Sequence, residues 1–184
     1  MRNLKVLTTH VDERFGAARD ISDYLSKYFT IVPRYDDVVI LGIGTDKCIG
    51  DCLGPLVGTI LQNKNIGFPV YGTLRRPLHA LNLKERVSYI KAKHPDSFII
   101  AIDACLGEDD DIGTIQTRNG PIDPGKGVGK NLPSVGDLSI IGIVEKLNNN
   151  GASLHNIRLS FVLEMAEIIT EGIIMGLEEL RIED

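Results

Sequence analysis

Two aspartates stand where a chain of this kind could place catalytic groups. Asp51 follows the apolar run 38–41 and a glycine-containing loop, and Asp103 ends the apolar run 98–102. Two carboxylates held close together do not both ionise readily, so they share a proton and titrate as a unit. The ionised member can take a proton from a water molecule that attacks a peptide carbonyl, while the protonated member donates to the leaving nitrogen. The pair therefore predicts acid–base hydrolysis, provided that the fold brings the two side chains together.

The elements around these aspartates predict such a meeting. Both apolar runs lack the alternation of a half-exposed strand, which is typical of strands buried on both faces of a parallel sheet. Neighbouring parallel strands present their carboxyl ends at the same edge, so we expect Asp51 and Asp103 in one crevice. Each residue alone also has a simpler interpretation, Asp51 as a helix cap and Asp103 as a turn residue.

The rest of the chain alternates helical with strand-like stretches, which indicates an α/β fold with a mainly parallel sheet flanked by helices. At 184 residues, 43% of them hydrophobic, we expect one domain over 1–184, with 1–35 as an N-terminal extension packed on it. The expected helices are 20–29, 53–61, 78–94 and 158–182, and the further expected strands are 68–73 and an edge strand at 114–118.

Composition and charge exclude several classes of function. The net charge of -5 and the pI near 5.4 argue against nucleic acid or an anionic membrane as partner. No apolar stretch reaches the length needed to span a bilayer, and residues 1–10 are too polar for a secretory signal. Three cysteines, an odd number in a chain that is not rich in them, favour a reducing compartment. We therefore expect a cytoplasmic protein without a nucleic-acid or membrane partner.

The C-terminal stretch 158–182 is apolar on nearly all of its surface. Its polar residues share one helical face: Ser160, Glu164, Glu167, Glu171 and Glu178. Such a helix is either packed deep against the sheet or shared with a partner subunit. A homo-oligomer is therefore one of the two arrangements expected.

Two glycine-containing stretches are similar to nucleotide-binding loops but lack residues that those loops need. Lys47 stands where a dinucleotide fingerprint requires its third glycine. Gly127 follows Lys126 where a phosphate loop requires Ser or Thr. Nucleotide binding is therefore rejected, and the Gly- and Pro-rich stretch 120–137 is expected to be a surface loop, or else a lid or substrate wall over the crevice.

Cysteine chemistry is the main rival to the carboxylate pair. Cys52 and Cys105 lie beside the two aspartates, which allows a thiol nucleophile or a mixed Asp/Cys metal site. Cys48 and Cys52 lack the close spacing of structural zinc sites, and buried thiols are common, so thiol chemistry ranks below the carboxylates. The four histidines are expected at the surface or as capping residues.

Four ordered motifs resemble the germination protease of spore-forming bacteria: 42–44, 50–55, 102–104 and 124–129. The length and layout are similar to the related YyaC-type sporulation proteins, and the resemblance covers roughly residues 36–180. It implies a fold shared with the hydrogenase-maturation endopeptidases, with a twisted, mainly parallel sheet between helices. It also implies a peptidase of the forespore or mother cell, whose substrates include the small acid-soluble spore proteins.

The same resemblance assigns the site residues. It implies that Asp51 and Asp103 are the catalytic pair, and the substrate is expected to contact five residues in or next to the motifs: Gly44, Thr45, Gly54, Gly127 and Gly129. In the hydrogenase endopeptidases the matching acids bind a metal with a later histidine, and here the stretch 133–139 contains none. We therefore expect neither a tightly held metal nor a cofactor. The alternative is a non-catalytic or metal-binding sporulation protein that keeps this fold as a binding module.

Overall fold

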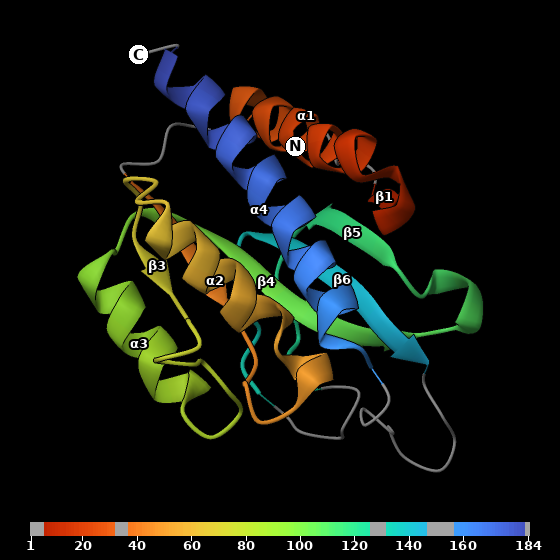
Figure 1. The fold of residues 1–184 in the computed structure, drawn as a ribbon. Helices are drawn as coiled ribbons and strands as arrows, with labels where there is room; N and C mark the ends of the chain where they lie inside the picture. Colours follow the sequence, from red (N-terminus) through yellow and green to blue (C-terminus); the bar gives the residue numbers. More distant parts are fainter. Residues whose placement is uncertain (1–5, 32–36, 126–131, 147–156, 183–184) are drawn as a thin grey trace.

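A six-stranded mixed sheet forms the centre of the protein (Figure 1). The computed structural model describes residues 6–31, 37–125, 132–146 and 157–182. The strands lie in the order β1 (Leu7–His10), β5 (Thr114–Asn119), β6 (Leu138–Lys146), β4 (Ser97–Gly107), β2 (Asp37–Gly42) and β3 (Val70–Tyr71). The last four of these are mutually parallel, whereas β5 and β1 are antiparallel to their neighbours. The predicted fold class, α/β with a mainly parallel sheet flanked by helices, is confirmed.

Helices cover both faces of the sheet. The helices α1 (Arg14–Ile31), α2 (Leu53–Asn63) and α4 (Leu159–Ile182) pack with one face, and α3 (Leu83–Lys93) packs with the other. Alternation along β2 explains the division, because its side chains point to opposite faces in turn. Ile40 joins the apolar cluster under α1, α2 and α4, while Val39 and Leu41 join the cluster under α3.

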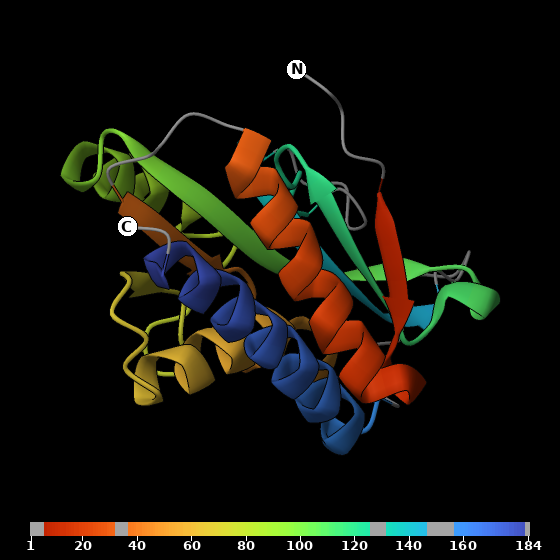
Figure 2. The same ribbon diagram turned by 90° about the horizontal axis from the view of Figure 1, so that it is seen from above.

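The helix α4 is packed deep, which is the first of the two arrangements expected for it. It lies beside α1 in both ribbon views and also contacts α2 (Figures 1 and 2). Met165, Ile169 and Ile173 are fully buried. At its polar edge, the Arg14 guanidinium of α1 donates to Glu167 at 2.9 Å and to Glu171 at 3.1 Å. The homo-oligomer stays a prediction.

Several element predictions need correction. The stretch 114–118 is not an edge strand, because β1, which was not predicted, pairs outside it. The strand β6 was also not predicted. The helix expected over 78–94 begins only at Leu83, since the preceding residues form turns, and the strand expected over 68–73 is confined to Val70–Tyr71. The N-terminal segment extends the sheet through β1 and the helical layer through α1.

Within the described residues, no helix combines the length and the apolar character that crossing a membrane requires.

Candidate active site

The strands β2 and β4 bring both aspartates to the carboxyl edge of the sheet. Gly42, the last residue of β2, pairs with Ile102, so Asp103 is the first residue of β4 beyond the end of β2. Asp51 ends the short 3-10 helix η2 (Ile49–Asp51), which follows β2 and contacts β4. Asp103 was expected at a strand end, but β4 continues to Gly107 alongside β6. Its carboxyl group reaches the edge because the neighbouring strand has ended.

Asp103 occupies an environment that favours its protonated form. It is buried, with 8% of its surface exposed, and its Oδ1 accepts a hydrogen bond of 2.9 Å from the Ala104 amide. Burial raises the pKa of Asp103 well above its usual value, the negative charge of Asp51 raises it further, and the Ala104 amide lowers it only in part. The two carboxyl groups are therefore close enough to interact electrostatically. Asp51 itself is half-buried.

Glycines hold the Asp51 loop against the end of β2. A Cβ atom on Gly44 would lie 2.0 Å from the Asp51 carbonyl oxygen, and one on Gly54 would lie 2.2 Å from the Ile43 carbonyl oxygen. Gly44 also has a φ of +132°, which few other residues adopt. The Thr45 amide donates to the Asp51 carbonyl at 2.9 Å. Three of the predicted substrate-contacting residues thus position Asp51 through the backbone, and their contact with substrate stays a prediction.

The other two predicted substrate-contacting residues, Gly127 and Gly129, lie outside the described residues. The described ends of that Gly- and Pro-rich stretch meet through Ile122 and Val135, whose backbones exchange hydrogen bonds of 2.8 and 2.9 Å. Both side chains join the apolar cluster on the α3 face of the sheet. The lid or substrate-wall role of the stretch stays a prediction.

The neighbouring thiols are held in their weakly nucleophilic form. Burial raises the pKa of Cys52, and the charges of Asp46 and Asp51 raise it further. Cys105 is an exposed residue, and the pKa of its thiol is raised by partial desolvation and by Asp103. Since the thiolate is the reactive species, these surroundings disfavour thiol attack. This agrees with the ranking of thiol chemistry below the carboxylate pair.

Among the described residues, the donor groups do not fit a resident metal. Within the described part of the chain, no three His, Cys, Asp or Glu side chains gather as a metal site requires. The stretch 133–139, in which the family pattern suggested a histidine, enters the sheet at the opposite edge. There the Asp137 amide donates to the Ile99 carbonyl at 2.8 Å, four residues before Asp103 on β4.

The described histidines take part in hydrogen bonds of the local structure. His10 contacts the Ile112 carbonyl oxygen at 3.1 Å, and the His79 amide donates to the Asn82 side chain at 2.9 Å. His94 lies between the Tyr71 hydroxyl at 2.9 Å and the Asp37 carboxylate at 3.1 Å. This Asp–His–Tyr chain was not predicted, because its members come from three separate elements. His155 lies outside the described residues.

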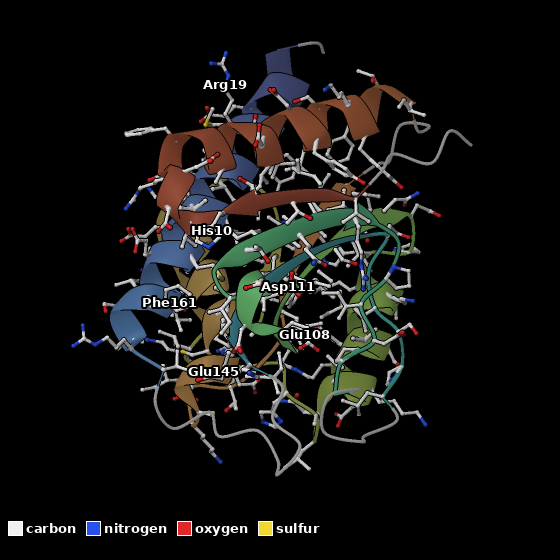
Figure 3. All side chains as sticks on the ribbon, turned by 90° about the vertical axis from the view of Figure 1, so that its right-hand side faces the viewer. His10, Arg19, Glu108, Asp111, Glu145 and Phe161 are labelled. Carbon is white, nitrogen blue, oxygen red and sulfur yellow. The ribbon has the colours of Figure 1, made fainter. Side chains whose placement is uncertain are left out.

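The acidic run 108–111 forms a solvated turn, as predicted. It contains the short 3-10 helix η3 (Asp109–Asp111) after β4, and Figure 3 shows Glu108 and Asp111 on this turn. Lys146 forms an ion pair with Asp109. An exposed and partly neutralised run of this kind needs no ligand to explain it.

These features define a class of protein: an α/β fold whose mixed sheet carries, at its carboxyl edge, a buried carboxyl group of raised pKa beside a second carboxylate. The chain belongs to the family described as "Protein of unknown function (DUF1256)", which matches residues 9–172. The predicted resemblance to YyaC-type proteins is confirmed at the level of the family.

Two individual proteins illustrate the relationship. Over 175 residues the chain is 42% identical to the "Uncharacterized protein YyaC" of Bacillus subtilis (strain 168), covering 92% of this chain and 82% of that protein. It is also similar to the crystal structure of the [NiFe] hydrogenase maturation protease HycI from Thermococcus kodakarensis KOD1. That match has 20% identity and a TM-score of 0.41, over 82% of this chain and 98% of the other.

Proposed function

We propose that this protein is an endopeptidase of sporulation or germination that hydrolyses peptide bonds through Asp51 and Asp103. The observation that carries the proposal is the inequality of the two carboxyl groups. Asp103 is buried and its pKa is raised well above the usual value, whereas Asp51 is half-buried and acts on it as a negative charge. A pair whose environments separate the two pKa values is suited to divide the roles of acid and base.

In the proposed reaction the Asp51 carboxylate takes a proton from a water molecule while the water oxygen bonds to the peptide carbonyl carbon. The Asp103 carboxyl group polarises the carbonyl oxygen and gives its proton to the leaving nitrogen as the carbon–nitrogen bond breaks. The proton gained by Asp51 then passes to Asp103, which restores the starting state. The reaction consumes one water molecule and needs no metal or cofactor.

The proposed substrates are proteins or peptides, among them the small acid-soluble spore proteins. The proposed location is the cytoplasm of the forespore or mother cell. Support for this biological role comes from the resemblance of four motifs to the germination protease, two of which contain Asp51 and Asp103.

The test is cleavage of purified small acid-soluble spore proteins by the wild type, Asp51→Asn, Asp103→Asn and the double variant. General acid–base catalysis contributes roughly 10²–10⁴-fold, so each single change should lower the rate by that order. Because the two groups act as a unit, the double change should add little. Asp46→Asn is the matched control, since Asp46 is an exposed acid of the same loop and should leave the rate unchanged.

Equal cleavage rates in all these variants would reject the carboxylate pair. A wild type that binds the spore proteins without cleaving them, and keeps that binding in both Asn variants, would instead identify the binding-module alternative.

A further inference from the structure

A basic cavity lies beside the outermost parallel strand, between residues 69–78 and the helix α3. Its volume is about 670 Å³. Figure 1 shows β3 and α3 next to each other at this end of the sheet. Neither Asp51 nor Asp103 lines this cavity, and the cavity has no role in the proposed chemistry.

Four cations line this cavity: Arg75, Arg76, Arg86 and Lys93. None of the described residues that line it is acidic, and none of the four cations forms an ion pair with another described residue. The whole chain carries 25 acidic and 20 basic residues, so this concentration of positive charge runs against the composition. A concave surface lined by one sign of charge attracts ligands of the opposite sign.

The positions of the cations favour an extended ligand over a compact anion. Arg86 and Lys93 are seven residues apart on α3, which corresponds to about 10 Å along the helix axis. That length matches about three residues of an extended peptide, and it exceeds what one phosphate group can bridge. Arg75 and Arg76 lie on a turn closed by the Arg76 amide, which donates to the Thr73 carbonyl at 3.0 Å. Arginine guanidinium groups bind carboxylates in a bidentate manner.

The edge of the sheet offers a second means of holding a peptide. The strand β3 ends the sheet on this side and pairs only with β2 among the described strands. An edge strand presents unpaired backbone groups to which an extended peptide can add as a further strand. The Tyr71 ring of β3 lines the cavity beneath the Lys93 ammonium, 6.0 Å from the ring centroid.

One residue that lines the cavity is hydrogen-bonded to the loop that positions Asp51. Leu78, which lines the cavity, accepts a hydrogen bond of 2.7 Å from the Gly44 amide, and Gly44 contacts the Asp51 carbonyl. Leu78 also belongs to the apolar cluster on the α3 face, to which strand alternation directs Asp103. We infer that the cavity binds an acidic, extended segment of the peptide substrate next to the bond to be cleaved. This inference rests on the proposed peptidase function in one respect: the peptide that the cavity binds is taken to be the substrate of that peptidase.

Binding is measured by fluorescence anisotropy of two labelled ten-residue peptides, one alternating Glu with Val and the other alternating Gln with Val. The Glu peptide should bind at least about tenfold more tightly, and rising salt should weaken it because the ion pairs are screened. The double variant Arg86→Gln/Lys93→Gln should weaken binding of the Glu peptide by roughly five- to tenfold, the size expected for the loss of two partly exposed ion pairs. Lys84→Gln/Lys91→Gln is the matched control, with the same spacing and charge change on α3 outside this cavity.

The inference would be overturned by equal binding of both peptides, by equal losses in the two double variants, or by displacement of the Glu peptide by millimolar inorganic phosphate. Stronger binding of single-stranded DNA than of the Glu peptide would assign the cavity to a different polyanion and also overturn it. The binding measurement is repeated on the Asp51→Asn variant, in which cleavage is expected to be lost. Peptide binding without cleavage by the wild type would reject the peptidase alone, whereas cleavage that is indifferent to the cavity variants would reject the cavity assignment alone.

Discussion

Asp103 owes its chemistry to its place in the sheet. An aspartate in water ionises near pH 4, but Asp103 is buried where β4, β6 and the Asp51 loop meet. Burial and the adjacent Asp51 charge both penalise its anion, and a single backbone amide compensates in part. The residue therefore binds its proton more tightly in the folded protein than in the unfolded chain.

This preference makes the stability of the protein depend on pH. Because the folded-state pKa of Asp103 is raised, its contribution is complete below the unfolded pKa of about 4 and is lost as the pH rises through the folded pKa. The slope should approach about 1.4 kcal/mol per pH unit within that window. Asp103→Asn removes the titrating group, so the free energy of unfolding should fall less steeply and exceed that of the wild type at the alkaline end.

Urea denaturation from pH 5 to pH 9 measures this difference. Asp46→Asn, an exposed change in the neighbouring loop, should follow the wild-type curve. If Asp103→Asn and the wild type kept a constant difference at every pH, Asp103 would not titrate anomalously.

At the scale of elements, the junction of β2 with α2 depends on backbone contact. Gly42, Gly54 and Gly72 approach one another so closely that a Cβ atom on any of them would overlap a neighbouring carbonyl oxygen. This contact seats the first turn of α2 against the end of β2 and fixes where the intervening loop presents Asp51. The glycines of the motif therefore serve to place the carboxylate.

Gly54→Ala tests that contact. The added Cβ atom would lie 2.2 Å from the Ile43 carbonyl oxygen, and backbone cannot yield as a flexible side chain can. The free energy of unfolding should fall by at least about 2 kcal/mol, as in strongly overpacked sites. Gly16→Ala in α1, whose nearest neighbour would be 3.8 Å away, should instead stabilise by about 0.5–1 kcal/mol. Thermal denaturation compares the two, and equal effects would contradict the role assigned to Gly54.

The buried strands were predictable because their apolar runs are continuous, and so was the meeting of Asp51 with Asp103 at one edge. The strand β1 was not predictable in the same way, since Leu7–His10 is mostly polar and depends on pairing with β5. In β6 the apolar run is interrupted by Gly142, which weakens the strand signal. A Cβ atom there would lie 2.2 Å from the Met165 sulfur of α4, so the glycine leaves room for the Met165 side chain.

The site was predictable only in part, for a related reason. Sequence spacing indicated that two carboxylates would converge, but it did not indicate which would be buried, since that depends on where β2 ends beside β4. The basic cavity was not predicted at all. Its cations come from a turn and from a helix, and their approach depends on how α3 packs beside β3.

Across the whole molecule, contacts from the N-terminal helix α1 reach two strands, β4 and β5. Tyr28 of α1 packs against Phe98 of β4 with ring centroids 5.1 Å apart, and its hydroxyl donates to the Asn119 side chain of β5 at 3.0 Å. The Tyr24 hydroxyl accepts a hydrogen bond of 3.0 Å from the Asn119 amide. These contacts anchor α1 on the sheet, which leads us to expect that it unfolds together with the core.

The change Ile21→Ala tests that expectation. Ile21 is fully buried in α1 against Gly172 of α4, so its truncation should lower the free energy of unfolding by about 2–5 kcal/mol. Phe15→Ala, on the same helix but with 87% of the Phe15 surface exposed, should have little effect. Native-state hydrogen exchange reports α1 and β4 separately, and in a single cooperative domain the most protected amides of both elements should lose stability by the same amount. If Ile21→Ala accelerated exchange in α1 while β4 kept its protection, the N-terminal segment would be a separable extension, and the protein would comprise two folding units.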